Sequence, residues 1–520
     1  MAKLAEAPPS RFNFAQHLAE RNTGRAGKIA YVDDSGSITY GELALKARQA
    51  ASALAALGLR REERVFVCLL DTVDFPVLYL GALYAGVVPV CVNTLLTVDD
   101  YVYMLEHSRA QALVVSSALV PMLSQAMSRS SHEVKHVIVS GAGDVPAGAL
   151  RFGDWIGRAA PATAPASTGP DSIAFWLYSS GSTGRPKGTV HSHGNLFWTA
   201  ETYGTHVLGL RESDVVFSVP KLYFAYGFGN SLTFPLWAGA TALLMAERPT
   251  PAAVFKRLVE RKPTVFFGVP TLYAAMLAAP DLPARGDVAL RLCVSAGEPL
   301  PKDIGDRFTA RFGCEILDGI GSTELLHIFL SNRPGDVRYG TTGKPVEGYD
   351  IELRGDDGRP VGDGEIGDLY IRGPSAALMY WENSNKSRAT FQGEWTKSGD
   401  KYVRGADGYY TYSGRSDDML RVSGQYVSPF EVEAALMRHD AVLEAAVVGR
   451  MEGGLTRTLA YVVLKSGHAE SGELADALKA FVKDQLAPHK YPREIRFLAE
   501  LPKTSTGKIQ RFKLREAAAR

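Results

Sequence analysis

The stretch Tyr178-Ser-Ser-Gly-Ser-Thr-Gly-Arg-Pro-Lys-Gly188 is rich in glycine and hydroxyl groups and ends in a lysine. Glycine permits positive φ, so consecutive backbone N–H groups of such a loop can point at one anion. It is not a Walker A loop, because that motif places its lysine directly behind the last glycine, whereas here Pro186 stands between Gly184 and Lys187. The run from Ile173 to Tyr178 has the pattern of a buried strand that would deliver the loop. A solvated Gly/Ser linker is the alternative, and the strand and the Lys187-Gly188 ending favour a polyphosphate loop.

This loop resembles the signature of the acyl-adenylate-forming superfamily, which includes acyl-CoA synthetases, peptide-synthetase adenylation domains and firefly luciferase. Five further motifs of the family follow in the family's order: Ser295-Ala-Gly-Glu298, Asp318-Gly-Ile-Gly-Ser-Thr-Glu324, Lys397-Ser-Gly-Asp400, Gly414-Arg-Ser-Asp-Asp418 and Pro502-Lys-Thr-Ser-Thr-Gly-Lys508. The matches cover residues 178 to 508, and the preceding part of the chain resembles the family more weakly. Within the family, the aromatic motif Tyr223-Phe-Ala-Tyr-Gly-Phe-Gly229 and the run Thr323-Glu-Leu-Leu-His327 most closely resemble those of benzoate–CoA ligases.

The chain has 520 residues, more than one hydrophobic core usually supports, so at least two domains are expected. Strand-like and helical runs alternate along most of the sequence, which predicts an α/β fold with layered, mostly parallel sheets. One βαβ unit is expected over residues 64–92. By resemblance, an N-terminal adenylate-forming domain (1–416) is followed by a small, mobile α+β lid domain (417–520). Near its start, Ser428 and Glu431 predict a capping box, with a helix that begins at Pro429.

Composition narrows the class of protein. There are 57 basic and 56 acidic residues, so the chain has no long-range field suited to nucleic acid or an anionic membrane. The four cysteines form no C-x-x-C pair and stand in apolar runs, which indicates core thiols in a reducing compartment. The uncharged run from Phe75 to Val92 is interrupted by Pro76, Gly86 and Pro89 and is better explained as core than as a membrane span. No export signal is evident, so we expect a cytoplasmic enzyme.

The chemistry that the resemblance implies is attack of a carboxylate on the α-phosphorus of ATP, with loss of pyrophosphate. Glu324 would bind Mg²⁺, because this cation accepts one carboxylate together with phosphate oxygens and water. Glu324 could also be the acid at a helix N-terminus, with Ser322-Thr-Glu as the cap. Asp400 would bind the ribose hydroxyls and Arg415 the ribose or a phosphate, although Ser-Gly-Asp alone is a common turn.

The adenine should lie between Ala296-Gly-Glu-Pro299 and Asp318-Gly-Ile320, and Ile320 stands where many members of the family carry an aromatic residue. His191 and His193, which follow the loop, are expected to be structural, because no partner lies at metal-ligand spacing. By resemblance, the full nucleotide-binding set is Ser180, Gly181, Ser182, Thr183, Gly184, Lys187, Ala296, Gly297, Glu298, Pro299, Asp318, Gly319, Ile320, Thr323, Asp400 and Arg415.

Catalysis is assigned by resemblance to Lys508, Thr183 and Glu324. An isolated lysine near a C-terminus is ordinarily a solvated charge, but the family's lysine at this position bridges the substrate carboxylate and the α-phosphate during adenylation. Asp417 matches the family's hinge, and hinges are short segments that absorb a change in backbone dihedral angles. After the lid rotates, Ser423, Gly424 and Gln425 would line the tunnel for the pantetheine arm of CoA.

The acyl pocket of this family lies between the aromatic motif, here Tyr223-Phe-Ala-Tyr-Gly-Phe-Gly229, and the run after Glu324. Aromatic rings, small residues and the single polar tip of His327 predict a short, flat slot lined by apolar groups. The alternative is that these aromatic residues are ordinary core. The proposed slot consists of Ala225, Tyr226, Ala296, Gly321, His327 and Ile328.

The resulting hypothesis is an AMP-forming ligase that uses ATP, Mg²⁺ and CoA to convert benzoate into benzoyl-CoA. Three alternatives stay open: a ligase for a hydroxy-, amino- or halobenzoate, an enzyme that loads an aryl acid onto a carrier protein, and an AMP-sensing scaffold on the same fold. The resemblance also allows a homodimer, and an acetyltransferase and deacetylase that act on Lys508.

Overall fold

The computed structural model of the chain describes residues 4–179, 185–416, 418–422, 425–452, 455–487, 490–503 and 509–518. Contacts divide the chain into two compact units, which are described separately. The first consists of residues 1–351 and 371–398, and the second of residues 352–370 and 399–520. Among the described residues no helix is long and apolar enough to cross a membrane.

An eight-stranded sheet of the first unit presents the predicted phosphate loop. Its order is β19-β9-β8-β4-β3-β5-β6-β7, and the strands from β8 to β7 are parallel, whereas β9 and β19 are antiparallel to their neighbours. The predicted βαβ unit is confirmed as β3, α3 and β4. The strands are β3 (Arg64–Cys68), β4 (Val88–Cys91), β5 (Ala112–Ser116), β6 (His136–Ser140), β7 (Leu150–Arg151), β8 (Ile173–Ser179), β9 (Lys187–Ser192) and β19 (Met379–Tyr380).

Helices cover this sheet because its strands are apolar on both faces. Tyr101 and Met104 of α4 and Leu123 of α5 pack with Phe66 and Val115 in one buried cluster. A Cβ at Gly81 of α3 would lie 2.6 Å from the Ala50 Cβ of α2, so glycine allows these two helices to approach closely. The helices of this half are α1 (Phe14–Arg21), α2 (Tyr40–Ala56), α3 (Asp74–Ala85), α4 (Val98–Ser108), α5 (Val120–Ser128) and α6 (Phe152–Gly157).

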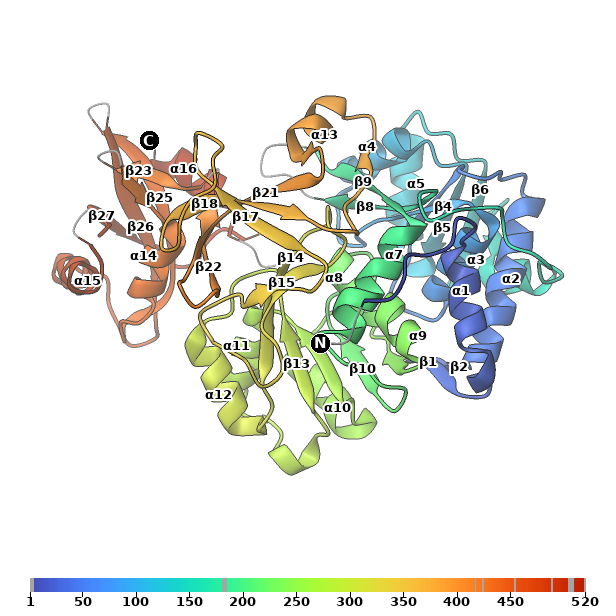
Figure 1. Cartoon of the computed structure of the whole chain (residues 1–520), viewed down its shortest axis with the longest axis horizontal. Coiled ribbons are helices and arrows are strands. Elements are labelled where there is room, and N and C mark those ends of the chain that lie inside the picture. The colour runs from blue at the N-terminus through green and yellow to red at the C-terminus, as the bar shows by residue number, and fades with distance from the viewer. Residues whose placement is uncertain are drawn as a thin grey trace. The chain divides into compact units, whose positions relative to one another are not determined.

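The second large sheet of this unit has the order β16-β15-β14-β13-β12-β10-β11-β1-β2, with a parallel central run from β14 to β1. Its strands are β1 (Ile29–Asp33), β2 (Gly36–Thr39), β10 (Val215–Ser218), β11 (Thr241–Leu243), β12 (Val265–Gly268), β13 (Leu292–Ser295), β14 (Ile316–Gly321), β15 (Ile328–Ser331) and β16 (Lys344–Pro345). α10 (Pro251–Arg261), α11 (Pro270–Ala278) and α12 (Lys302–Phe312) pack on it through buried apolar residues, beside β10 and β13 in Figure 1.

Shorter helices complete the first unit. α7 (His193–Thr199) continues into a π-helical turn (Ala200–Thr205), and α8 (Ala225–Phe228) continues through a second π-helical turn (Gly229–Thr233) into α9 (Phe234–Ala238). α13 (Ser384–Thr390) precedes the short strand β20 (Phe391–Gln392). The four cysteines are buried free thiols, as predicted.

The second unit contains β17 (Asp350–Arg354) from its residue 352 onward and most of β18 (Ile366–Arg372), β21 (Trp395–Arg404) and β22 (Tyr410–Arg415). A hairpin of β23 (Leu420–Val422) and β24 (Gln425–Val427) follows. The last sheet has the order β25-β26-β27, formed by β25 (Val442–Glu452), β26 (Leu455–Leu464) and β27 (Glu494–Phe497). Its helices are α14 (Pro429–Leu436), α15 (Gly472–Gln485) and α16 (Arg511–Ala518).

Alternating residues of β25 divide these helices between the two faces of the sheet. Ala445 and Val447 pack with α14 and α15, whereas Ala446 and Val448 pack with Leu514 of α16. This is the two-residue period of a strand that is buried on both sides. The predicted α+β character of the C-terminal part is therefore confirmed.

At the start of α14, only half of the predicted capping box is formed. The Ser428 hydroxyl accepts a hydrogen bond from the Glu431 backbone N–H, 3.1 Å away, as a capping box requires. The Glu431 carboxylate, however, accepts hydrogen bonds from Lys490 at 2.7 and 2.8 Å. The Glu431 carboxylate is thus paired with Lys490, which is distant in the sequence, instead of accepting from the Ser428 backbone N–H as a capping box requires.

The division into compact units places residues 352–370 and 399–416 with the C-terminal part. The predicted boundary at 416/417 concerns the point about which a lid would rotate, which compactness does not test. That boundary therefore stays a prediction.

Candidate active site

The strands β8 and β9 form an antiparallel hairpin in which Ser179 is paired with Lys187. The predicted phosphate loop joins these two residues, so its base is fixed by the edge of a large sheet. Ser180, Gly181, Ser182, Thr183 and Gly184 themselves lie outside the described residues.

The Glu324 carboxylate lies at the base of this loop. Its Oε1 atom accepts hydrogen bonds from the Tyr380 hydroxyl at 2.7 Å and from the Ser179 hydroxyl at 3.2 Å. The Lys187 ammonium is 3.9 Å from the same oxygen, and the side chains of Lys187 and Glu324 are each 16% exposed. A lysine and a carboxylate held together beside a phosphate loop can place positive charge and a metal-binding oxygen on one polyphosphate.

Tyr380 was missed by the sequence analysis. It stands 56 residues after Glu324, and it reaches the site because β19 pairs with β9, opposite Thr189. Its hydroxyl accepts a hydrogen bond from Lys187 at 3.3 Å, and the Lys187 ammonium also lies 4.4 Å from the centre of its ring. Tyr380 therefore holds both charged groups of the site, and no local motif in the sequence signals this role.

Glu324 stands in a turn, so the expectation that it begins a helix is wrong. The Leu325 backbone N–H donates to the Ser322 hydroxyl at 3.2 Å, but the chain then enters β15 rather than a helix. His191 holds this turn by donating from Nε2 to the Thr323 carbonyl at 2.7 Å, while its Nδ1 accepts from the Asn195 amide at 2.9 Å. Complete burial lowers the pKa of His191 to about 4, so the imidazole is neutral and structural.

The second histidine, His193, is also structural, as predicted. It is fully buried, its Nδ1 atom accepts a hydrogen bond from the Phe14 backbone N–H at 3.2 Å, and burial lowers its pKa to about 4. Among the described residues no group of three or more His, Cys, Asp or Glu side chains could hold a metal ion. A lone carboxylate such as Glu324 nevertheless fits Mg²⁺, because this ion usually keeps several waters and phosphate oxygens as ligands.

The two segments predicted to enclose the adenine lie at the ends of two adjacent parallel strands. Ser295 of β13 is paired with Asp318 of β14, so the segment 296–299 and residues 318–320 are neighbours, as expected. The Leu300 backbone N–H donates to Asp318 Oδ2 at 3.4 Å, and Gly297 adopts a φ of +93° in the turn between them. Burial raises the pKa of the Asp318 carboxyl well above its usual range.

The predicted aryl slot brings α8 and the start of β15 together. The centroid of the His327 ring lies 5.7, 5.1 and 4.5 Å from the ring centroids of Tyr226, Tyr203 and Phe234, respectively. A Cβ at Gly229 would lie 2.3 Å from His327 Cδ2, so only glycine leaves room for this imidazole. Ala225, Ala296 and Ile328 are buried, and their contact with a substrate ring stays a prediction.

The hydrogen bonds of His327 define its tautomer. Its Nε2 atom faces two acceptors, the Tyr226 carbonyl at 3.3 Å and Asn230 Oδ1 at 3.1 Å, so Nε2 carries the proton. The Asn230 orientation follows from its own amide, which donates to the Ser218 hydroxyl at 3.3 Å. Nδ1 is therefore an acceptor, it is buried, and no described residue donates to it. Burial lowers the pKa of His327 to about 3, which keeps the ring neutral.

Asn230, Tyr203 and Phe234 were not predicted as site residues. They lie on helical segments where polar and aromatic residues also form ordinary core, and only the tertiary contact with His327 gives them a role. The Gly321 backbone is part of the same contact, because a Cβ there would meet the His327 carbonyl at 2.6 Å.

In the second unit, the predicted ribose residues are close together. Asp400 on β21 is paired with Arg415 on β22, and their side chains form an ion pair at 3.1 Å. Asp417, Ser423, Gly424 and Lys508 lie outside the described residues, and of Gln425 only its place at the start of β24 is described.

Two family models match the chain: the AMP-binding enzyme over residues 18–381 and the AMP-binding enzyme C-terminal domain over residues 431–508. A benzoate–CoA ligase of Thauera aromatica is 57% identical over 98% of this chain and 97% of its own length. A 4-hydroxybenzoate–CoA/benzoate–CoA ligase of Rhodopseudomonas palustris is 49% identical over 98% of the chain and 95% of its length.

A solved structure of a benzoate CoA ligase from Burkholderia xenovorans LB400 superposes with a TM-score of 0.90 and 64% identity, over 97% of this chain and all of that one. The similarity thus extends over both family models and the whole fold. The chain belongs to the AMP-binding enzyme family.

Proposed function

We propose that this chain is an AMP-forming ligase that converts benzoate, ATP and CoA into benzoyl-CoA, AMP and pyrophosphate. In the first step a benzoate oxygen attacks the α-phosphorus, and the bond to pyrophosphate breaks. In the second step the CoA thiol attacks the acyl carbon of benzoyl-AMP, the thiol loses its proton, and AMP leaves. The first step brings anions together, so its catalysis depends mainly on charge neutralisation and alignment.

Lys187 and Glu324 are assigned to the phosphates. Both are largely buried at the base of the predicted loop and are held by the Tyr380 hydroxyl. Glu324 would hold Mg²⁺, which would supply positive charge to the polyphosphate. Thr183 and the other residues of the loop keep their predicted part in holding these phosphates.

The nucleoside is assigned to the two strand ends at Ser295 and Asp318 and to the pair Asp400 and Arg415. An ionised carboxylate accepts both hydrogens of a vicinal diol, which is the chemistry that a ribose offers. Arg415 already pairs with Asp400 at 3.1 Å and so orients it.

The observation that supports an aryl acid as the substrate is the environment of His327. A neutral imidazole buried among three aromatic rings offers apolar walls with one polar group, as expected of a site for a small flat acid. The names of all three relatives include benzoate–CoA ligase and so support the same ring.

The roles outside the described residues complete the proposal. Lys508 bridges the substrate carboxylate and the α-phosphate, the chain turns about Asp417 between the two steps, and Ser423, Gly424 and Gln425 line the path of the pantetheine arm. The boundary at 416/417, a homodimer and acetylation of Lys508 belong to the same proposal and await direct measurement.

A benzoate with a hydroxyl or amino substituent is the second candidate substrate. The observation that favours it is the buried, unbonded Nδ1 acceptor of His327, because an unsatisfied buried acceptor costs free energy that a donor on the ring would recover. The relative from Rhodopseudomonas palustris is named for both kinds of acid.

The test is a panel of acids given to the purified chain with ATP, Mg²⁺ and CoA. Pyrophosphate release and the acyl-CoA mass are recorded for benzoate, the hydroxy- and aminobenzoates and short aliphatic acids. We expect the highest kcat/KM with benzoate. Pyrophosphate without acyl-CoA would indicate a carrier-loading enzyme, whereas no pyrophosphate with any acid would indicate a nucleotide-binding scaffold.

A further inference from the structure

The described residues on either side of the segment 504–508 are joined by main-chain contacts. Lys503 and Ile509 form an antiparallel bridge, and the Gln510 backbone N–H donates to the Pro502 carbonyl at 2.8 Å. Ile509 directly follows Lys508, and α16 begins only three residues after it, at Arg511. Whatever fixes the start of α16 therefore also fixes Ile509 and Gln510, the two residues that directly follow Lys508.

The start of α16 is fixed by a buried ion pair. Arg511 Nη2 donates to both oxygens of Glu433, at 2.8 and 2.6 Å. The Glu433 side chain is 4% exposed, and its Oε1 atom also accepts from the Val447 backbone N–H at 2.7 Å. Glu433 thereby joins α14, β25 and α16 at one point.

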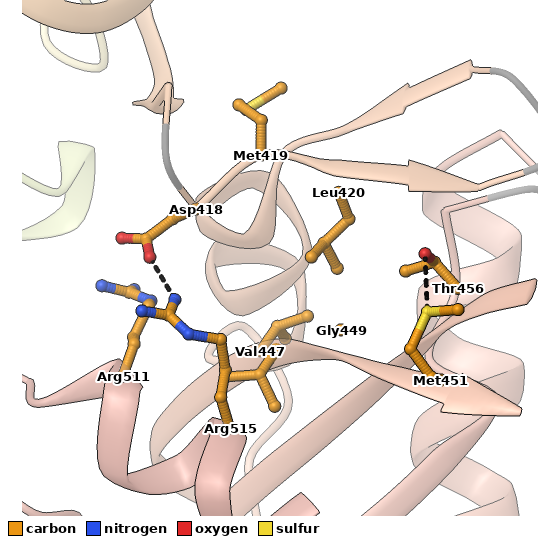
Figure 2. Close-up of a pocket in the computed structure, with 10 residues that line it drawn as sticks. Asp418, Met419, Leu420, Val447, Gly449, Met451, Thr456, Arg511 and Arg515 are labelled. Carbon is orange, nitrogen blue, oxygen red and sulfur yellow. Dashed lines mark hydrogen bonds and ion pairs between the residues drawn. The ribbon is translucent and has the colours of Figure 1, made fainter. Parts of the chain in front are cut away.

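A second, more exposed pair lies on the same helix. Arg515 stands four residues after Arg511, on the same face of α16, and donates to Asp418 at 2.6 Å. Figure 2 shows Arg511 and Arg515 on successive turns of the helix, with Asp418 beside them. Asp418 directly follows the predicted hinge residue Asp417, so α16 is braced both to the sheet and to the segment next to the hinge.

We propose that Arg511 and Glu433 are positioning residues for adenylate formation, because their buried pair holds the end of the loop from which Lys508 reaches the α-phosphate. The proposal rests on the proposed function of Lys508. Arg511 makes both contacts through one nitrogen, Nη2, at the end of its side chain. A lysine ammonium lies one bond nearer to its Cα, so a lysine at this position could not reach both oxygens of Glu433 without a shift of α16. A misplacement of about 1 Å at a reacting group can cost about 100-fold in rate, so a small shift of α16 is enough to matter.

The proposal is tested with Arg511→Lys and Glu433→Gln in the full chain. Each half-reaction is measured separately: pyrophosphate release from benzoate and ATP, and benzoyl-CoA formation from supplied benzoyl-AMP. We expect kcat of the first half-reaction to fall by about 10- to 100-fold, with unchanged KM for ATP and benzoate. The second half-reaction should keep its wild-type rate.

The matched control is Glu431→Gln, which breaks the ion pair with Lys490 from the same helix, α14, without touching α16. It should leave both half-reactions unchanged. If Arg511→Lys lowers both half-reactions equally and in step with Tm, or lowers neither, the positioning role is refuted.

Two further variants keep the result interpretable. Lys508→Ala should lower the first half-reaction by about 100- to 1,000-fold, and an unchanged rate would refute the proposed function of Lys508 rather than the role of the Arg511–Glu433 pair. If neither pair variant folds, Glu433→Asp keeps the charge but shortens the side chain that reaches Arg511. It should lower only the first half-reaction, and an unchanged rate would overturn the proposal.

Discussion

Replacing His327 by alanine removes the imidazole around which the aryl slot is built. The ring contacts Tyr203, Tyr226 and Phe234 at centroid distances of 5.1, 5.7 and 4.5 Å. It also donates from Nε2 to Asn230 at 3.1 Å. The variant therefore loses one wall of the slot, and it leaves the buried Asn230 acceptor without this donor.

The magnitude follows from these contacts. One lost contact with the substrate ring is worth about 1–3 kcal/mol, or about 10- to 200-fold in kcat/KM. We expect the KM for benzoate to rise by this factor while the KM for ATP stays constant, because the nucleotide residues lie elsewhere. A benzoate with an added substituent should lose less, because its extra atoms occupy the vacated space. The assay is pyrophosphate release at varied benzoate, substituted benzoate and ATP.

His193→Ala is the matched control. His193 is equally buried, neutral and hydrogen-bonded, but it contacts the Phe14 backbone instead of the slot. Truncating a large buried side chain costs about 2–5 kcal/mol of stability, so both variants should show a lower Tm. If both lose stability but His327→Ala retains the wild-type benzoate KM, His327 is core packing and the slot has been assigned to the wrong residues.

Three further outcomes are expected. Lys508→Ala should lower the rate of adenylation by about 100- to 1,000-fold, the usual cost of removing one preorganised charge, and should spare thioester formation from supplied benzoyl-AMP. Acetylation of Lys508, which removes the same charge, should have the same effect. Equal losses in both steps would contradict the proposed role of Lys508. Asp417→Pro should restrict the hinge, so CoA transfer falls while adenylation survives, and the reverse pattern would place the hinge elsewhere. Stability should fall as pH falls below 6.5, because burial lowers the pKa of His191 and His193 to about 4 and that of His327 to about 3, so the unfolded chain binds more protons in this range. Each histidine contributes about 2 kcal/mol of this loss at pH 5. Burial raises the pKa of Asp71 to about 6 and also raises the pKa values of Asp74 and Asp318, and these three carboxyls act in the opposite direction. The measurement is therefore the difference between urea midpoints at pH 8 and pH 5, which His193→Gln should reduce; equal differences in the variant and the wild type would refute the assignment.

Much of the fold could be predicted from local pattern. Apolar runs such as Val265–Gly268 became parallel strands, because a sheet covered on both faces by helices needs strands that are apolar on both sides. Pro429 at the first position of α14 was also predicted correctly, since its missing N–H and fixed φ suit a helix start. The Glu431 carboxylate could not be predicted, because Lys490 is 59 residues away and competes for it only in the folded chain.

In the candidate site, too, some residues could be predicted from local motifs and others are placed only by tertiary contacts. Lys187, Glu324, Asp318 and Asp400 stand in short motifs, and a motif preserves the local geometry that its chemistry needs. Tyr380 and Asn230 have no motif, because strand pairing and helix packing bring them to the site across 56 and 97 residues. The protonated nitrogen of His327 is likewise fixed by acceptors that only the tertiary fold brings near it. His327 could therefore be predicted from the sequence as a residue of the slot, but the direction of its hydrogen bonds could not.

Buried polar atoms without a partner are rare in folded proteins, and each calls for an explanation. Thirteen side-chain atoms of the described residues are buried in this way, and three of them, Asp318 Oδ1, Ser295 Oγ and His327 Nδ1, stand on β13, on β14 or next to β15. The Tyr226 hydroxyl belongs with them, since it interacts with Asn230 but makes no well-formed hydrogen bond. Such atoms lower stability in the unliganded chain, and a ligand or an ordered water that supplies the missing partners recovers that free energy. The other nine such atoms lie elsewhere, for example on the core residues Tyr79 and Trp176, so a missing partner does not by itself distinguish a binding site from core. At the strand ends proposed to hold the nucleotide and the aryl ring the expectation is specific: a bound ligand should supply hydrogen-bond partners to these four atoms and so raise the free energy of unfolding.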